Sequence, residues 1–280
     1  MTIHGPDETT AGEPTVFTVR IVNRSNAAAT EGTVTLTFPE GTLPIEGLNP
    51  LTAPLKTKLD VGDIPAGGEF QTEVPVRLVG VVGERQTVSG VYLYRPENVD
   101  RQLTRRAEFA TEVARVPLVV ALEAPTRVSS GQELAVTVSV DSELTAPLRG
   151  FSLGVAYPPG FELKSVDPAP LPGSQSIWSL DTLEPGASEK ITLHGIIRGD
   201  PEEVKAFHLR VGRYRPESDT WFLVAERSVG PTIASPFLFV QSILNGNRRG
   251  SLAPGSRVEG VVVFKNNLPS AIENVTVTVA

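Results

Sequence analysis

The chain has 280 residues, of which 40% are hydrophobic, and this supplies enough apolar material for the packed cores of two or three domains. It carries 25 basic and 32 acidic residues, and the net charge of -7 argues against a nucleic-acid backbone or an anionic membrane surface as its main partner. Because there is no cysteine, disulfides, thiolate metal sites and cysteine nucleophiles are excluded.

Alternation of apolar and polar residues dominates the chain. Such runs predict half-buried strands, and the clearest of them lie, in chain order, at 15–22, 33–38, 134–140 and 258–264. The 24 prolines and 25 glycines leave no room for a helix of ordinary length. We expect at most a short helical turn at 201–205. The sequence therefore predicts an all-β protein.

An internal repeat divides the chain. Six prolines and glycines recur 119 residues later: Pro6, Gly12, Pro39, Gly41, Gly67 and Pro117 correspond to Pro125, Gly131, Pro158, Gly160, Gly186 and Pro236. Short strands separated by turns within a repeat of this length predict immunoglobulin-like β-sandwich domains, over 1–115 and 116–231. The link between them, "ARVP", contains no flexible spacer, so we expect a semi-rigid rod.

A third copy begins after the second. "SPFLFVQSIL" from Ser235 matches "VPLVVALEAP" from Val116, and "APGSRVEGVVVFKNN" from Ala253 matches "AGEPTVFTVRIVNRS" from Ala11. We expect residues 232–280 to form only the first strands of this copy. A sandwich needs both sheets to cover its inner faces, so this segment should be incomplete, mobile or paired with another molecule. The prediction is thus tandem sandwiches, two complete and a third incomplete.

The tetrapeptide "YRPE" occurs at 94–97 and again at 214–217, an offset of 120 that a one-residue bulge would explain. In both copies it separates two alternating strands, so it should open a hairpin. In an immunoglobulin-like topology this hairpin lies at the N-terminal end of its domain, near the joint with a preceding domain. We interpret the repeated pairs as scaffold of the turn and the joint. The alternative is presentation to a partner, since tyrosine and arginine are enriched at binding hot spots. The residues concerned are Tyr94, Arg95, Tyr214 and Arg215.

The two tryptophans receive different predictions. Trp178 corresponds to Leu59 in the repeat and should be a core residue, because both copies place an apolar side chain there. Trp221 follows a turn, so we count it among the candidate interdomain or partner contacts. An exposed tryptophan on a sandwich is how many carbohydrate-binding modules stack sugars, but one aromatic side chain does not make a platform.

Residues for catalysis are not found. The histidines, His4, His194 and His208, stand apart without the partners of a zinc site, and no phosphate-binding or nucleophile motif is present. Paired carboxylates such as Asp60 with Asp63 lie beside turns, where solvated side chains are expected. We therefore predict no enzyme activity, no metal site and no cofactor.

The repeat pattern resembles a known family. The stretch "AGEPTVFTVRIVNRSNAAATEGTVTLTFPEGT", the turn in "LEPGASEKITL" and the Y-R-P hairpin are similar to tandem immunoglobulin-like repeats of bacterial cell-surface proteins, including adhesion-related CARDB-type domains. The resemblance implies an exported structural protein, anchored outside the repeats and displaying them as a stalk or adhesive arm. We accordingly expect an extracellular, cell-surface location, with neighbouring repeats of the same chain as partners.

The sequence shows neither a signal segment nor a run long enough for a membrane helix, which fits a fragment without membrane contact of its own. Two other functions stay open. One is a binding module for an unidentified glycan or protein ligand, accompanying a secreted protein. The other is an assembly subunit that is completed by strand exchange, as the unfinished third copy suggests.

Overall fold

The computed structural model describes residues 1–46, 54–235, 238–246, 257–267 and 276. Strands form most of it, which confirms the all-β prediction, and the described helical element is the 3-10 turn η1, Pro216–Ser218. The helical turn expected at 201–205 is wrong. Residues 201–202 form a simple turn, and Glu202 adopts a φ of 64°, outside the helical region.

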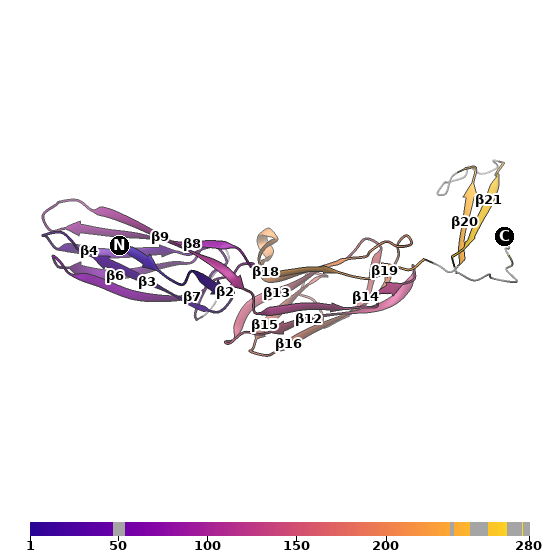
Figure 1. Ribbon diagram of the computed structural model, residues 1–280, viewed down its shortest axis with the longest axis horizontal. Helices are drawn as coiled ribbons and strands as arrows, with labels where there is room; N and C mark the ends of the chain where they lie inside the picture. Colours follow the sequence, from indigo (N-terminus) through magenta and orange to yellow (C-terminus); the bar gives the residue numbers. More distant parts are fainter. Residues whose placement is uncertain (47–53, 236–237, 247–256, 268–275, 277–280) are drawn as a thin grey trace.

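Two sheets pack face to face in the first sandwich (Figure 1). Their strand orders are β1-β3-β7-β5 and β2-β9-β8-β4-β6. The strands are β1 (Thr2–His4), β2 (Glu8–Thr10), β3 (Pro14–Val22), β4 (Ala29–Thr37), β5 (Leu43–Pro44), β6 (Lys56–Ile64), β7 (Glu69–Arg77), β8 (Arg85–Pro96) and β9 (Leu103–Arg115). The first strand pairs antiparallel with β3, whereas β2 crosses to the other sheet and pairs parallel with β9. This crossing is typical of an immunoglobulin-like sandwich.

The second sandwich repeats these pairings. Its sheets have the orders β10-β12-β16-β14 and β15-β13-β17-β18, and β11 pairs parallel with β19. The strands are β10 (Leu118–Glu123), β11 (Arg127–Val128), β12 (Gln132–Ser142), β13 (Leu148–Ala156), β14 (Phe161–Asp167), β15 (Ile177–Leu183), β16 (Ser188–Ile197), β17 (Phe207–Arg215), β18 (Thr220–Val229) and β19 (Thr232–Ile233). Thr2 faces Arg20 in the first sandwich, and Ala121 faces Ser139 in the second, so both partners shift by 119 residues.

The second sandwich extends past residue 231, where we expected it to end. Thr232 and Ile233 pair with β11, and Ile233 is fully buried. These residues therefore belong to the second sandwich and not to the third copy. The boundary was placed too early because the parallel pair joins two short segments that lie far apart in the sequence.

Alternation along the strands produces one core in each sandwich. The first contains Phe17 and Phe38, whose ring centroids are 5.9 Å apart, and the second contains Phe151 and Phe207. Trp178 is 2% exposed, and its indole Nε1 donates to the Pro168 carbonyl at 2.9 Å, which confirms it as a core residue.

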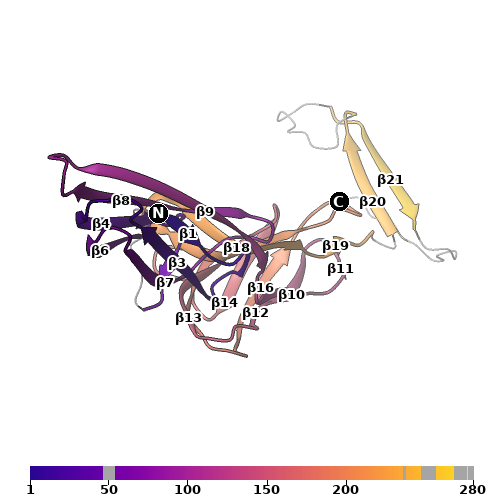
Figure 2. The ribbon, with the colours of Figure 1, turned by 60° about the vertical axis from the view of Figure 1, so that its left-hand side comes forward.

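Beyond the second sandwich, β20 (Leu238–Leu244) and β21 (Gly260–Asn266) form an antiparallel two-stranded sheet (Figures 1 and 2). Apolar side chains are exposed on it, among them Val240 at 53%, Val261 at 52% and Phe264 at 60%. The rest of the expected third copy lies outside the described residues.

Asn23 provides a test of how the first sandwich is held together at its open end. Its buried amide donates to the carbonyls of Ile64 and Pro65 in the facing loop and of Ala27 in its own loop, so Asn23→Ala removes the side-chain link between the two loops. We expect a loss of about 1–3 kcal/mol in the free energy of unfolding, measured by urea denaturation with circular dichroism. The control is Arg20→Ala, which breaks a half-exposed ion pair with Glu69 and should lower stability by less than about 1 kcal/mol. An Asn23→Ala effect no larger than the control would contradict this account.

Candidate functional site

The two sandwiches meet end to end, and the joint between them is the candidate functional site (Figure 1). Strand β9 ends at Arg115 and β10 begins at Leu118, so Val116 and Pro117 form the link. The link is itself packed. Val116 lies against the core of the second sandwich, and the Pro117 carbonyl accepts a hydrogen bond from the Glu143 amide at 2.8 Å. A link held at these points cannot act as a free hinge.

Apolar residues at the C-terminal end of the first sandwich continue the core of the second. Ala11, Leu43 and Val79 are buried in the same cluster as Leu144 and Leu148. The joint thus has an uninterrupted apolar centre. Burial of this kind resists separation of the two ends, because it would return apolar surface to water.

Two turns of the first sandwich approach the second so closely that they require glycine. Gly12 and Gly41 have φ values of 77° and 81°, in the left-handed region. A Cβ on Gly12 would lie 2.9 Å from Leu148 Cδ2, and a Cβ on Gly41 would lie 3.0 Å from the Cβ of Phe222. Glycine is therefore needed at both positions for the backbone angle and for the contact across the joint.

Polar contacts fix the orientation of the joint. The Glu13 carboxylate accepts hydrogen bonds from the Thr145 amide at 2.5 Å and from the Thr145 hydroxyl at 2.6 Å. Arg115 forms an ion pair of 2.6 Å with Glu143. Both partners of that pair are more than half exposed, so it contributes little to stability, whereas the contact of Glu13 with a backbone amide is directional.

The buried polar contact is made by Arg213, which is 3% exposed and donates from Nη1 to the Gly41 carbonyl at 2.9 Å. Burial, and then the neighbouring Arg215, lower the pKa of Arg213 to about 10, which leaves the guanidinium charged at neutral pH. A buried charge is costly without polar partners. Movement of the first sandwich away from this position would therefore remove an acceptor that Arg213 needs.

The two YRPE copies do not occupy equivalent positions. Val34 faces Tyr92 and Leu153 faces Val211, so β8 and β17 correspond at an offset of 119, and the equivalent of Tyr94 is Arg213. We expected a bulge to keep the two copies aligned. The register shift between β17 and β18 instead leaves β17 continuous and adds the extra residue to β18. A slip by one residue turns a side chain to the opposite face of its sheet.

The side chains follow this slip. Tyr94 stacks on Tyr92, with ring centroids 4.8 Å apart and an interplanar angle of 9°, on the inner side of its sheet. Tyr214 instead contacts Trp221 at 4.9 Å on the outer side, away from Arg213. The repeated letters therefore mark the same hairpin in both sandwiches, but their tyrosines face in opposite directions.

The other predicted contacts are distributed between two faces. Arg95 pairs with Glu31 at 3.6 Å within the first sandwich. The Arg215 guanidinium lies 5.3 Å from the centre of the Phe222 ring, so it supports the joint through that ring. These arrangements place Arg215, but not Arg95, beside the other sandwich.

Trp221 packs on the outer face of its own sandwich. The Arg210 guanidinium lies 5.0 Å from its ring centre, and the ring covers Gly154. From this hairpin, Arg213 and Phe222 reach the first sandwich, and the sequence analysis did not single them out. Alternation from Val211 along β17 would have indicated Arg213, had the two copies been aligned on the strand and not on the tetrapeptide.

Among the residues that the structure describes, no group of three or more histidine, aspartate or glutamate side chains could hold a metal ion. None of the described helices is long and apolar enough to cross a membrane.

Comparison with known proteins does not assign the chain to a family. No family model matches the chain, and no curated protein matches it. Among solved structures it is similar to red sea bream transglutaminase, with 10% identity and a TM-score of 0.35 over 84% of this chain and 31% of that one. A Salmonella α2-macroglobulin reacted with methylamine gives 11% identity and a TM-score of 0.35, over 91% of this chain and 17% of that one.

The native conformation of an E. coli α2-macroglobulin gives 10% identity and a TM-score of 0.35, over 86% and 17% of the respective chains. The chain therefore spans less than a third of the length of these structures. Similarity at this level says nothing about what the chain binds. The observed pairings and the joint define the class of protein, a tandem immunoglobulin-like β-sandwich chain.

Arg213→Met tests whether the buried hydrogen bond sets the angle of the joint. The variant keeps the length of the side chain and removes the donor to Gly41, so we expect a wider distribution of interdomain orientations. Stability should change less, because the variant also removes a buried charge. Residual dipolar couplings of the two sandwiches measure the orientation. The matched control, Arg210→Met, lies over Trp221 on the outer face and should change tryptophan fluorescence alone. Equal effects of both variants on orientation would count against this role.

Gly12→Ala tests the close approach. Gly67 is the matched control, because it has nearly the same φ, 76°, but no atom within 4 Å of an added Cβ. Gly67→Ala should destabilise by the backbone strain alone, about 1–2 kcal/mol. Gly12→Ala should add the clash with Leu148 and loosen the joint. Urea denaturation and residual dipolar couplings give the two readouts, and a Gly12→Ala variant that keeps the joint ordered would refute the contact.

Proposed function

We propose that this chain is a non-catalytic spacer or adhesive stalk segment of a bacterial cell-surface protein. The joint is the observation that carries the proposal, since a two-residue link, an apolar centre and the Arg213 to Gly41 hydrogen bond hold consecutive sandwiches in line. A stalk needs units that fold individually and joints that resist bending. The first sandwich meets the first need with a core cluster of its own.

The mechanism of such a segment is mechanical. Each sandwich buries its own apolar surface, and each joint limits the angle between neighbours, so a row of them projects whatever lies at its end. The cell-surface, extracellular location and the partnership with further repeats are supported by the resemblance of the sequence to repeats of bacterial surface proteins. A glycan-binding role finds less support, because Trp221 is covered by Arg210 and Tyr214.

Insertion of about six glycine and serine residues between Pro117 and Leu118 tests the proposal. The natural chain should show one shared alignment tensor for both sandwiches and a narrow distance distribution in small-angle X-ray scattering. The inserted linker should give two tensors and a broad distribution, because it removes the packed link. A natural chain whose sandwiches already reorient independently would rule out the spacer role.

A second candidate function is favoured by the β20–β21 sheet. Its exposed apolar side chains, Val240 and Phe264 on one face and Val261 on the other, suit a subunit that pairs with a strand of another molecule. The full chain should then form concentration-dependent oligomers in analytical ultracentrifugation. A chain ending at Ala234, which keeps Ile233 in the second sandwich, should stay monomeric. Val240→Thr with Phe264→Thr should weaken the association without truncation, and a full chain that is monomeric at all concentrations would exclude this function.

A further inference from the structure

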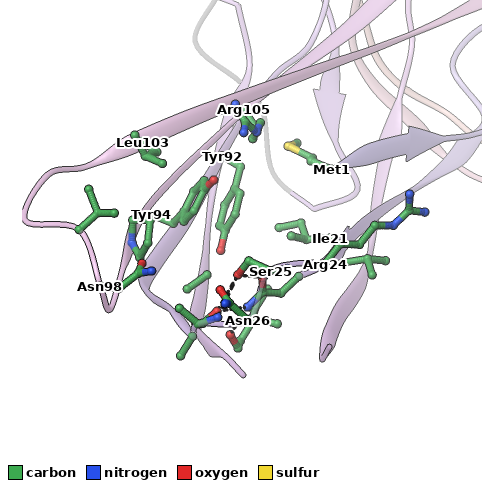
Figure 3. Close-up of a pocket in the computed structure, with 18 of the residues that line it drawn as sticks. Met1, Ile21, Arg24, Ser25, Asn26, Tyr92, Tyr94, Asn98, Leu103 and Arg105 are labelled. Carbon is green, nitrogen blue, oxygen red and sulfur yellow. Dashed lines mark hydrogen bonds between the residues drawn. The ribbon is translucent and has the colours of Figure 1, made fainter. Parts of the chain in front are cut away.

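The open end of the first sandwich contains a cavity of about 630 Å³ (Figure 3). Tyr92 and Tyr94 form one side of it, and the loop with Arg24, Ser25 and Asn26 lies opposite. Burial is the main cause that raises the pKa of Tyr92 to about 12, so the Tyr92 phenol is neutral at physiological pH. The cavity is thus an aromatic hollow with a polar loop at its edge.

The cavity lies at the end of the first sandwich that is equivalent to the joint end of the second sandwich. Strands β4 and β13 begin at Ala29 and Leu148, and Tyr94 faces Leu103 as Arg213 faces Phe222, so residues 119 apart correspond at this end. The joint residues Leu144, Thr145, Leu148, Arg213 and Phe222 have as their equivalents Ser25, Asn26, Ala29, Tyr94 and Leu103. All five equivalents line the cavity.

Side-chain size differs between the two ends. Ser25 and Ala29 stand where Leu144 and Leu148 fill the joint, and this leaves the hollow. An occupant that follows the geometry of the joint must therefore bring apolar volume of its own. In the existing joint the sizes are reversed, since Gly12 of the incoming end makes room for Leu148.

Charge differs as well. Arg24 takes the place of Glu143, which pairs with Arg115 in the joint. Arg105 and Arg20 also line the cavity, and Arg20 pairs with Glu69. None of the described residues that line the cavity is an aspartate or glutamate. In the joint the corresponding loop already receives a carboxylate, that of Glu13, on the backbone amide of Thr145. An occupant with a carboxylate would match both the arginines at the cavity and the backbone amide of the loop.

We propose that this cavity is a docking site for the C-terminal end of an immunoglobulin-like sandwich of a partner protein, an end that carries a carboxylate and a protruding apolar side chain. The carboxylate accepts from the Asn26 amide and lies near Arg24, and the apolar side chain fills the space beside Ser25 and Ala29. The inference rests on the proposed function, because the joint within this chain is its template. A sandwich end is favoured over a small molecule because the equivalent surface of the second sandwich is covered by such an end.

The chain supplies a probe for this site. Met1 corresponds to Val120, since Thr2 and Ala121 have equivalent pairings, so residues 1–119 fused directly before Met1 of the full chain reproduce the natural link. The fusion also gives the added sandwich a high effective concentration at the cavity. Hydrogen exchange of the Asn26 amide, followed by NMR, is the readout. We expect docking to slow this exchange by about tenfold or more.

Three variants make the test specific. Glu13→Ala in the added sandwich removes the acceptor and should abolish the protection of Asn26, whereas the same substitution in the original sandwich should affect the Thr145 amide instead. Asn26 has an exposed side chain, so Asn26→Trp should block the cavity without unfolding the sandwich; its readout is the orientation of the added sandwich in residual dipolar couplings. Ala29→Leu restores the leucine of the joint and should slow the exchange of Asn26 further, because the added end is shaped for leucine.

The outcomes separate this inference from the proposed function. If Asn26 exchanges freely both in the fusion and in the fusion with Ala29→Leu, whose cavity matches the added end, while Thr145 stays protected, the joint holds and the docking site is refuted. If Thr145 exchanges freely too, the proposed function itself is refuted. Protection of Asn26 that rises with concentration in the unfused chain would identify a second copy as the occupant and overturn the proposed partner. Protection that survives Glu13→Ala in the added sandwich would overturn the role of the carboxylate.

Discussion

The hydrogen bond from Arg213 to the Gly41 carbonyl is the constraint on which the arrangement of the two sandwiches depends. It joins residues 172 positions apart and lies in a buried place, where a guanidinium needs acceptors. Gly41 can serve as an acceptor because its φ of 81° turns the carbonyl toward the joint and because it has no Cβ to collide with Phe222. The orientation of the sandwiches thus depends on the charged Arg213 in the second sandwich and on the missing side chain of Gly41 in the first.

Comparison of the two sandwiches distinguishes residues that the fold requires from residues that vary at the ends of the sandwiches. Pairings such as Val34 with Leu59 and Leu153 with Trp178 are equivalent in both sandwiches, because an inward position needs an apolar side chain whatever its size. The ends are free of this requirement. There, leucines in one sandwich and small residues in the other produce a filled joint and an open cavity on the same backbone frame.

Much of the fold could be predicted from the sequence because its determinants are local. Alternation indicates the strands, and glycines at turns, such as Gly12 and Gly131 with φ of 77° and 84°, reveal the repeat since few other residues adopt that conformation. The joint could not be predicted in the same way. Glu13 and Thr145 are 132 residues apart, and nothing in either neighbourhood indicates the other. The YRPE match was misleading for a related reason, since four identical letters do not show which face of a strand they occupy.

The link also explains why a joint with few polar contacts can suffice. With Val116 and Pro117 as the whole connection, the two ends remain close, and contacts too weak to bind separate molecules can still select one orientation. An exposed pair such as Arg115 with Glu143 acts in this way, contributing to the angle and little to stability. A partner that docks without such a link must obtain its affinity from contact alone. A hollow of about 630 Å³ with an aromatic wall offers buried surface that the filled end of the second sandwich does not, which is why the open end of the first sandwich is the better surface for a separate molecule.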